Sequence, residues 1–325
     1  MSKKPNIVIV DGFTANSGDL SWEAFARLGN LQIFDRTGAG EIVPRICEAD
    51  AVITNKVPMT REIIGKAPHL RYIGLLSTGY NIVDLAATAE RGIIVSNVPT
   101  YATEAVAQHT LALLLELTNA VALHSADVHA LGWSRSQDYS YRLAPLRELQ
   151  SLTMGLIGFG RIAEHVGKIA HALGMKILAT RRNVLSTPPP PDYVCYAALD
   201  EVLAQSDVIS LHCPLTDETQ KLINEKTLGL MKPTAFLINT ARGGLIEETA
   251  LAKALKENRL AGFAADVLST EPPAENNPLL GAPRCIITPH IAWAAKETRQ
   301  RLLNETAENL AAFLRGTPRN TVPPA

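Results

Sequence analysis

Short apolar runs alternate with helix-like segments along almost the whole chain, and this alternation restricts the fold more than any other feature. In the first hundred residues, five runs have the length of a buried strand: Ile7–Val10, Leu31–Phe34, Ala51–Thr54, Tyr72–Leu75 and Ile93–Val95. Helical spacing separates them, as at Ser21–Leu28 and at Asp84–Arg91, where Asp84 is placed to cap a helix. Alternation of this kind predicts a parallel sheet with helices on both faces.

A second alternating series begins at Thr153. It has six strand candidates: Thr153–Gly158, Lys176–Thr180, Val208–His212, Ala235–Asn239, Gly262–Leu268 and Cys285–Thr288. Helical spacing lies between them, most clearly over Ile162–Leu173, Leu199–Gln205 and Glu247–Glu257. Six strands joined by crossovers are typical of the doubly wound sheet of a dinucleotide-binding domain. The length of 325 residues fits about two domains.

A long apolar helix and an irregular segment join the two series. The helix begins near Thr103 and is apolar on nearly every side through Leu115, so we expect it to be buried, in part against a second subunit of a homodimer. The segment that follows, Leu131–Arg147, is predicted to be a loop-rich arm. A final amphipathic helix is predicted over Lys296–Arg315, and Gly316 ends it.

Charge and cysteine content argue against several classes of protein. The 31 basic and 32 acidic residues nearly cancel, which does not favour binding to nucleic acid or to an anionic membrane. No apolar stretch reaches the roughly 18 residues that a membrane-spanning helix needs. The 4 cysteines stand far apart without the spacing of a metal or redox site. We therefore expect free thiols, no bound metal and a cytoplasmic location.

The segment Gly158–Ala163 has the pattern G-x-G-x-x-A between a predicted strand and a predicted helix. In a dinucleotide site, Gly158 would permit a tight turn, and Gly160 would let backbone amides approach a pyrophosphate at the helix N-terminus. The alternative is a glycine turn with a purely structural role.

Two arginines, Arg181 and Arg182, follow the second strand of this domain, roughly 20 residues after the glycine turn. A site for NAD usually has Asp or Glu there, which binds the ribose 2′-hydroxyl. A guanidinium instead matches the charge and geometry of a 2′-phosphate. The pair favours NADP(H); the alternative is NAD(H) beside two solvated arginines.

Three later segments place a cation, a carboxylate and a histidine after successive strands. They read N-T-A-R-G-G at 239–244, A-D-V-L-S-T-E-P at 265–272 and I-T-P-H-I-A at 287–292. With these motifs the sequence resembles the D-isomer-specific 2-hydroxyacid dehydrogenases, and most of all their glycerate dehydrogenase/hydroxypyruvate reductase branch. The resemblance covers nearly the whole chain. It implies two doubly wound parallel-sheet α/β domains, with a Rossmann cofactor domain at 101–290 inserted into a flavodoxin-like substrate domain at 1–100 and 291–325.

The resemblance implies catalytic roles for three residues. Arg242 would hold the substrate carboxylate with its guanidinium fork. His290 would be the acid/base, and Glu271 would orient the imidazole and favour its protonated form. The alternatives are a cation at a helix start for Arg242, a solvated loop carboxylate for Glu271 and a structural role for His290.

Further contacts are implied with less force. The expected substrate contacts are Lys56, Thr78, Gly79, Arg242, His290 and Trp293. The expected cofactor contacts are Thr103, Gly158, Gly160, Arg161, Ile162, Arg181, Arg182, His212, Pro214, Thr219, Thr240, Ala241, Arg242, Asp266, His290 and Ala292. Some positions keep an alternative: a solvated side chain for Lys56, a simple strand-to-helix turn for Thr78 and Gly79, a helix cap for Thr103 and Thr219, a structural role for Asp266, and packing at the domain boundary for Trp293. The remaining histidines outside these motifs, His109 among them, are interpreted as structural or exposed.

The activity implied is reduction of a small 2-keto acid to a D-2-hydroxy acid by NADPH or NADH. Hydroxypyruvate and glyoxylate, which give D-glycerate and glycolate, are the expected substrates. One alternative is an NAD-dependent enzyme for another 2-keto acid. Another is a non-catalytic, dinucleotide-sensing protein like the transcriptional corepressors that share this fold, and the near-zero net charge and lack of docking motifs argue against it.

Overall fold

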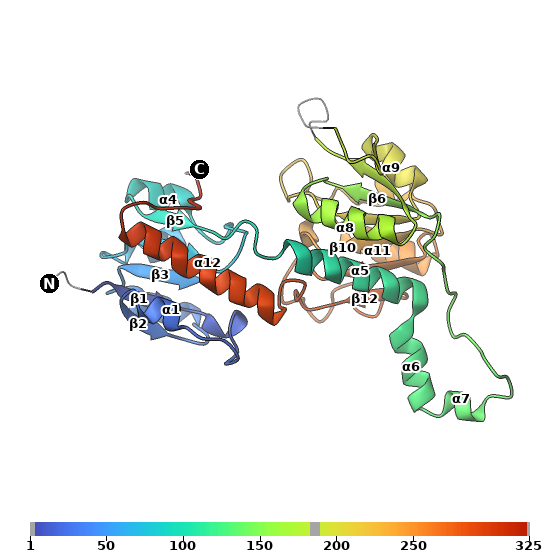
Figure 1. Ribbon diagram of the computed structural model, residues 1–325, viewed down its shortest axis with the longest axis horizontal. Helices are drawn as coiled ribbons and strands as arrows, with labels where there is room; N and C mark the ends of the chain where they lie inside the picture. Colours follow the sequence, from blue (N-terminus) through green and yellow to red (C-terminus); the bar gives the residue numbers. More distant parts are fainter. Residues whose placement is uncertain (1–3, 183–188, 324–325) are drawn as a thin grey trace. The chain divides into compact units, whose positions relative to one another are not determined.

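The computed structural model describes residues 4–182 and 189–323, and the chain divides into two compact units. Unit 1 consists of Met1–Ala102 and Trp293–Ala325, and unit 2 consists of Thr103–Ala292. Each unit is built on a parallel sheet of its own (Figure 1). The predicted class, two α/β domains of which one is inserted into the other, is confirmed.

Unit 1 contains a five-stranded sheet in the order β2-β1-β3-β4-β5. The strands are β1 (Asn6–Ile9), β2 (Asn30–Ile33), β3 (Ala51–Thr54), β4 (Tyr72–Leu75) and β5 (Ile94–Ser96). Every residue of β3 and β4 is buried, because helices cover both faces of the sheet. This strand order is that of the flavodoxin-like fold, as expected for this part of the chain.

Five α-helices are described in unit 1: α1 (Glu23–Ala26), α2 (Ile42–Ile46), α3 (Arg61–Gly65), α4 (Leu85–Glu90) and α12 (Lys296–Leu314). Asp84 accepts a 2.8 Å hydrogen bond from the amide of Ala87 and caps α4, as predicted. The long helix α12 packs on the sheet, where Phe313 stacks on Tyr72 with ring centroids 4.8 Å apart. The sequence does not indicate α2 and α3, because five residues make little more than one turn.

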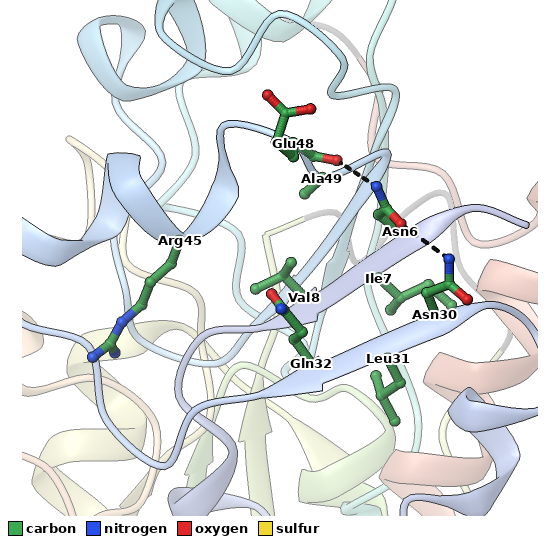
Figure 2. A pocket seen from close by; sticks show the side chains of 9 residues that line it. All are labelled: Asn6, Ile7, Val8, Asn30, Leu31, Gln32, Arg45, Glu48 and Ala49. Carbon is green, nitrogen blue, oxygen red and sulfur yellow. Dashed lines mark hydrogen bonds between the residues drawn. The ribbon is translucent and has the colours of Figure 1, made fainter.

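A cavity of about 270 Å³ lies beside β1, β2 and the end of α2 (Figure 2). The polar side chains in its wall bind one another, since Asn30 donates to Asn6 at 3.2 Å and Asn6 donates to the carbonyl oxygen of Glu48 at 3.0 Å. Arg45 forms an ion pair with Glu41, with 2.6 Å between the guanidinium nitrogen and the carboxylate oxygen. None of the predicted site residues lines this cavity.

Unit 2 contains a seven-stranded sheet in the order β12-β11-β10-β9-β6-β7-β8. The strands are β6 (Thr153–Ile157), β7 (Lys176–Thr180), β8 (Val194–Tyr196), β9 (Val208–Leu211), β10 (Phe236–Asn239), β11 (Gly262–Ala265) and β12 (Cys285–Ile287). Six strands were expected, and that number is wrong. The strand missed is β8, an edge strand of three residues whose middle residue, Cys195, is exposed.

The described α-helices of unit 2 are α5 (Thr103–Asn119), α6 (Val121–His129), α7 (Gly132–Arg135), α8 (Arg161–Ala172), α9 (Leu199–Gln205), α10 (Glu225–Leu228) and α11 (Glu248–Lys256). The predicted loop-rich arm is partly helical, since it contains α7 and is preceded by the unpredicted α6. Ala120 has a φ of 46° and separates α5 from α6. Among described residues, no single helix could span a membrane; only α5 and α6 taken together have the length and composition, and they are bent by 59°.

Candidate active site

The strand order of unit 2 brings most of the predicted cofactor residues and the predicted catalytic residues to the carboxyl ends of its strands. The chain runs from β6 through β7 to β8 on one side, and from β9 through β10 and β11 to β12 on the other. The winding therefore reverses between β6 and β9, which is where open α/β sheets bind ligands. All these strands pair in parallel, so the loops that follow them all leave from the same end of the sheet, where the strands have their carboxyl ends.

The glycine turn follows β6, and its two glycines differ in the space that a side chain would find. Gly158 has a φ of +90°, and a Cβ there would lie 2.5 Å from the backbone nitrogen of Cys213, so the turn itself requires this glycine. A Cβ at Gly160 would have no described atom within 4 Å. Helix α8 begins at the next residue, Arg161, without a side-chain cap. Open space before uncapped amides fits the pyrophosphate of a dinucleotide.

The end of β7 carries Arg181 and Arg182, both exposed. Arg182 forms an ion pair of 2.6 Å with Glu218, in the loop after β9. Thr219 stabilises that loop through two hydrogen bonds. Its hydroxyl donates to the carbonyl oxygen of Pro214 at 2.6 Å and accepts from the amide of Thr216 at 2.8 Å. Thr219 therefore supports the loop between β9 and α10.

His212 lies directly after β9 and is partly buried. Its Nε2 atom is 2.9 Å from the hydroxyl oxygen of Ser210. Burial lowers the pKa of His212 to about 4, so the ring is neutral near pH 7.

Arg242 is held by its backbone in the loop after β10. The buried side chain of Asn239 donates to the carbonyl oxygen of Arg242 at 2.9 Å and accepts from the amide of Ala241 at 3.0 Å. A Cβ at Gly243 would lie 1.9 Å from the carbonyl carbon of Leu268, so this loop is packed against the loop after β11. The Arg242 guanidinium is exposed and forms no ion pair with any described residue, which leaves its charge available to an anion.

His290 and Glu271 form a hydrogen-bonded pair, with 2.6 Å between Nδ1 of the imidazole and Oε2 of the carboxylate. The other oxygen of Glu271 accepts from the amide of Leu268 at 3.1 Å, which fixes the carboxylate. Because a carboxylate only accepts, Nδ1 of His290 carries the hydrogen and Nε2 faces away from Glu271. The structure thus brings His290 and Glu271 together, and their catalytic roles stay a prediction.

Asp266 is almost completely buried after β11. Its two oxygens accept hydrogen bonds of 2.8 Å from the amides of Ile291 and Ala292. The hydroxyl of Thr288 donates to it as well, at 2.6 Å. Asp266 therefore holds the backbone that follows His290 and the side chain of Thr288 before it, which is consistent with the structural alternative for this residue.

Thr240 and Thr103, both in unit 2, belong to the expected cofactor contacts. The hydroxyl of Thr240, after β10, is 2.9 Å from that of Thr110 on α5. Thr103 is the first residue of α5 and is buried.

Asn239 and Gly243 were not singled out from the sequence, although both belong to the same motif as Arg242.

The other predicted substrate residues lie in unit 1. The backbone amides of Asn55, Lys56 and Val57 all donate to the carboxylate of Asp11, which fixes the loop that carries Lys56 after β3. Burial raises the pKa of Asp11 in spite of these hydrogen bonds.

The remaining three predicted positions of unit 1 have clear contacts. The hydroxyl of Thr78 donates to the carbonyl oxygen of Val98 at 2.8 Å, and the carbonyl oxygen of Gly79 accepts from Ser77 at 2.6 Å. Trp293 is 8% exposed and packs edge-on against Tyr101, with 6.4 Å between ring centroids. Trp293 therefore packs within unit 1, and its role towards a substrate stays a prediction.

Sequence comparison gives a family model and a close relative. The model for the D-isomer specific 2-hydroxyacid dehydrogenase, NAD binding domain, matches residues 111–292. The hydroxypyruvate reductase of Blautia hydrogenotrophica is 46% identical over 320 residues, which cover 97% of this chain and 99% of that protein.

Two similar solved structures contain nicotinamide dinucleotides. The D-lactate dehydrogenase of Aquifex aeolicus, complexed with NAD and lactic acid, has a TM-score of 0.81 and 31% identity, and the match covers 96% of each chain. The acyclic imino acid reductase Bsp5, in complex with NADPH and D-Arg, has a TM-score of 0.84 and 30% identity, covering 98% of this chain and 100% of that one.

Proposed function

The chain belongs to the D-isomer-specific 2-hydroxyacid dehydrogenases, and from this premise we propose that it reduces hydroxypyruvate to D-glycerate, with glyoxylate as a second substrate. It is an oxidoreductase that uses a nicotinamide dinucleotide. The observation that carries the proposal is the 2.6 Å pair of His290 and Glu271, at the same sheet edge as Arg242. The hydroxypyruvate reductase with 46% identity supports the choice of substrate.

Two side chains of unit 2 act directly on the substrate. Arg242, which no described carboxylate neutralises, binds the substrate carboxylate through two N–H donors of its guanidinium. His290 gives a proton from Nε2 to the C2 carbonyl oxygen during reduction and takes it back during oxidation, while Glu271 holds the ring through Nδ1. When bound, the nicotinamide supplies the hydride that C2 receives.

We propose that NADPH is preferred to NADH. Arg181 and Arg182 follow β7, and the sequence has no Asp or Glu from residue 181 to residue 191 that could bind a ribose 2′-hydroxyl. Arg182 is paired with Glu218, but both side chains are more than half exposed. An exposed pair is worth only about 0–1 kcal/mol, so a 2′-phosphate could displace Glu218.

Contacts outside unit 2 are proposed on the family resemblance. Lys56 and the backbone at Thr78 and Gly79 are proposed to contact the substrate. Asp11 and the hydroxyl contact to Val98 hold these two loops in fixed conformations, which supports a binding role. Replacement of Lys56 by Ala should raise KM for the keto acid and leave the dissociation constant of the dinucleotide unchanged.

A homodimer and a cytoplasmic location are also proposed. The four cysteines of the described chain are free thiols, as expected in a reducing compartment. Helix α6 has no buried residue, although Val121 and Val128 are apolar, and a second copy of the chain would cover them.

The proposed reaction is tested by steady-state kinetics of the purified protein. Hydroxypyruvate, glyoxylate and pyruvate are each combined with NADPH and with NADH, and the loss of the reduced nicotinamide absorbance is followed. We expect the highest kcat/KM for hydroxypyruvate with NADPH, and His290→Gln should abolish it. Highest activity with pyruvate and NADH would identify the alternative dehydrogenase. No turnover in any combination would contradict the proposed function.

A further inference from the structure

His109 lies on α5, far in sequence from the catalytic motifs, and its side chain is only 19% exposed. Its Nε2 atom is 3.0 Å from the hydroxyl oxygen of Thr288 and 3.6 Å from Oδ1 of Asp266. Thr288 follows β12 and stands two residues before His290. The sequence suggested only a structural or exposed role for His109, whereas the structure connects it to the segment that carries the acid/base.

Hydrogen-bond chemistry fixes the direction of this connection. The hydroxyl of Thr288 has one hydrogen, and it donates that hydrogen to Oδ1 of Asp266 at 2.6 Å, with the carbonyl oxygen of Ala265 as a more distant acceptor at 3.3 Å. Towards His109 the hydroxyl oxygen must therefore accept. It follows that Nε2 of His109 carries a hydrogen and donates it, and that the chain of donors runs from His109 through Thr288 to Asp266.

Asp266, the last acceptor in this series of hydrogen bonds, restrains the backbone at His290. His290 has a φ of 56°, a left-handed conformation that a side chain with a Cβ disfavours. Such a conformation persists where neighbouring contacts fix it. Here the amides of the next two residues, Ile291 and Ala292, both donate to Asp266, which is the acceptor that Thr288 also binds.

We propose that His109 is a positioning residue for His290. By donating to Thr288 it keeps the hydroxyl turned towards Asp266, and Asp266 then holds the backbone in the conformation that pairs His290 with Glu271. The proposal rests on the proposed function only for its kinetic consequence. Proton transfer needs an aligned imidazole in the transition state, so a displaced His290 lowers kcat more than it raises KM.

The kinetic test compares two replacements of His109. His109→Leu removes the donor and should lower kcat for hydroxypyruvate about fivefold to tenfold, the size expected when one hydrogen bond is lost. The dissociation constant of NADPH and the melting temperature should stay as in the unaltered protein. His109→Gln retains an N–H donor near the position of Nε2 and should restore most of the rate. His69→Leu, at an exposed position in unit 1, is the matched control and should have no effect.

A double-mutant cycle tests the route through Thr288. Thr288→Val should lower kcat as much as His109→Leu, and the double variant should be no slower than either single variant, because both remove the same connection. Additive losses, or a glutamine variant as slow as the leucine variant, would overturn the proposal.

Crystal structures of the unliganded protein separate this proposal from the proposed function. In His109→Leu we expect the Nδ1–Oε2 distance between His290 and Glu271 to exceed hydrogen-bonding range, or φ of His290 to leave the left-handed region. An unchanged His290–Glu271 pair in that variant would overturn the positioning role, even if the protein reduces hydroxypyruvate. Conversely, a displaced pair would support it even if another keto acid proved to be the substrate.

Discussion

Arg242 has a backbone that is fixed by hydrogen bonding and packing, and a guanidinium that no carboxylate of the described residues neutralises. Its carbonyl oxygen is held by Asn239, its neighbour Gly243 packs against the carbonyl group of Leu268, and its guanidinium has no ion-pair partner among the described residues. Asn239 and Gly243 therefore place the backbone from which a guanidinium fork can reach a carboxylate.

We expect Arg242→Ala to lower kcat/KM for hydroxypyruvate by about 10²-fold or more, because two charge-assisted hydrogen bonds worth roughly 3 kcal/mol are lost. Arg242→Lys keeps the charge but not the fork, and should recover only part of the rate. Dinucleotide binding, measured by fluorescence titration, should change little in either variant. Unaltered steady-state kinetics in the alanine variant would remove Arg242 from the site.

His212 should make the stability of the protein depend on pH. Its pKa falls from 6.5 to about 4 because the ring is desolvated, so between these values the unfolded chain binds a proton that the folded chain does not. Stability is therefore lost as the pH falls from 6.5 towards 4. The loss should be about 2 kcal/mol, less than the full shift would give, because the ring is only partly buried.

The measurement for His212 is urea unfolding at several pH values, compared between the protein and His212→Asn. The other histidines titrate in both proteins, so the difference between the two curves isolates residue 212. We expect this difference in unfolding free energy to shrink as the pH is lowered through the window. A difference that is independent of pH would show that the ring is not desolvated in the folded state.

The turn from β6 into α8 offers a test of phosphate binding that separates it from a structural role. A methyl group at Gly160 would meet no described atom, whereas one at Gly158 would strike the backbone of Cys213. Gly160→Ala should therefore fold with an unchanged melting temperature but bind NADPH at least about tenfold more weakly, since the methyl occupies the space before the α8 amides. Gly158→Ala should fail to fold stably. Undiminished NADPH affinity in Gly160→Ala would favour the purely structural glycine turn.

Elements with a strong local pattern could be predicted from sequence, and those without one could not. The central strands are continuous apolar runs, and α8, α11 and α12 have one apolar face, so their spacing indicated them. In contrast, α6 has no buried residue and β8 has three residues at a sheet edge, so neither gives a core-directed pattern. The pairing of His290 with Glu271 could be inferred from their motifs and the family resemblance. The His109–Thr288 contact could not, because it joins residues 179 positions apart and depends on the packing of α5.

At the scale of the whole molecule, each unit has an apolar core on both faces of its sheet, and this explains why one unit can be inserted into the other in sequence. Within unit 2, however, α5 and α6 leave an apolar surface that its own core does not cover. A cavity of about 490 Å³ lies along α5 and α8 between the exposed side chains of Leu115 and Ile169. Val121 on α6 is 61% exposed. Monomeric proteins seldom leave such a surface uncovered.

We therefore expect light scattering to give a mass of twice 35.1 kDa, with a melting temperature that rises with protein concentration. In a two-fold dimer each substitution occurs twice, so Val121→Glu combined with Val128→Glu places four charges at the interface and should yield monomers. Leu280→Glu, at a similarly exposed apolar residue in a loop of unit 2, should leave the mass unchanged. A monomer for the unaltered chain would refute the dimer while leaving the proposed chemistry intact, because Arg242, Glu271 and His290 all come from one copy of unit 2.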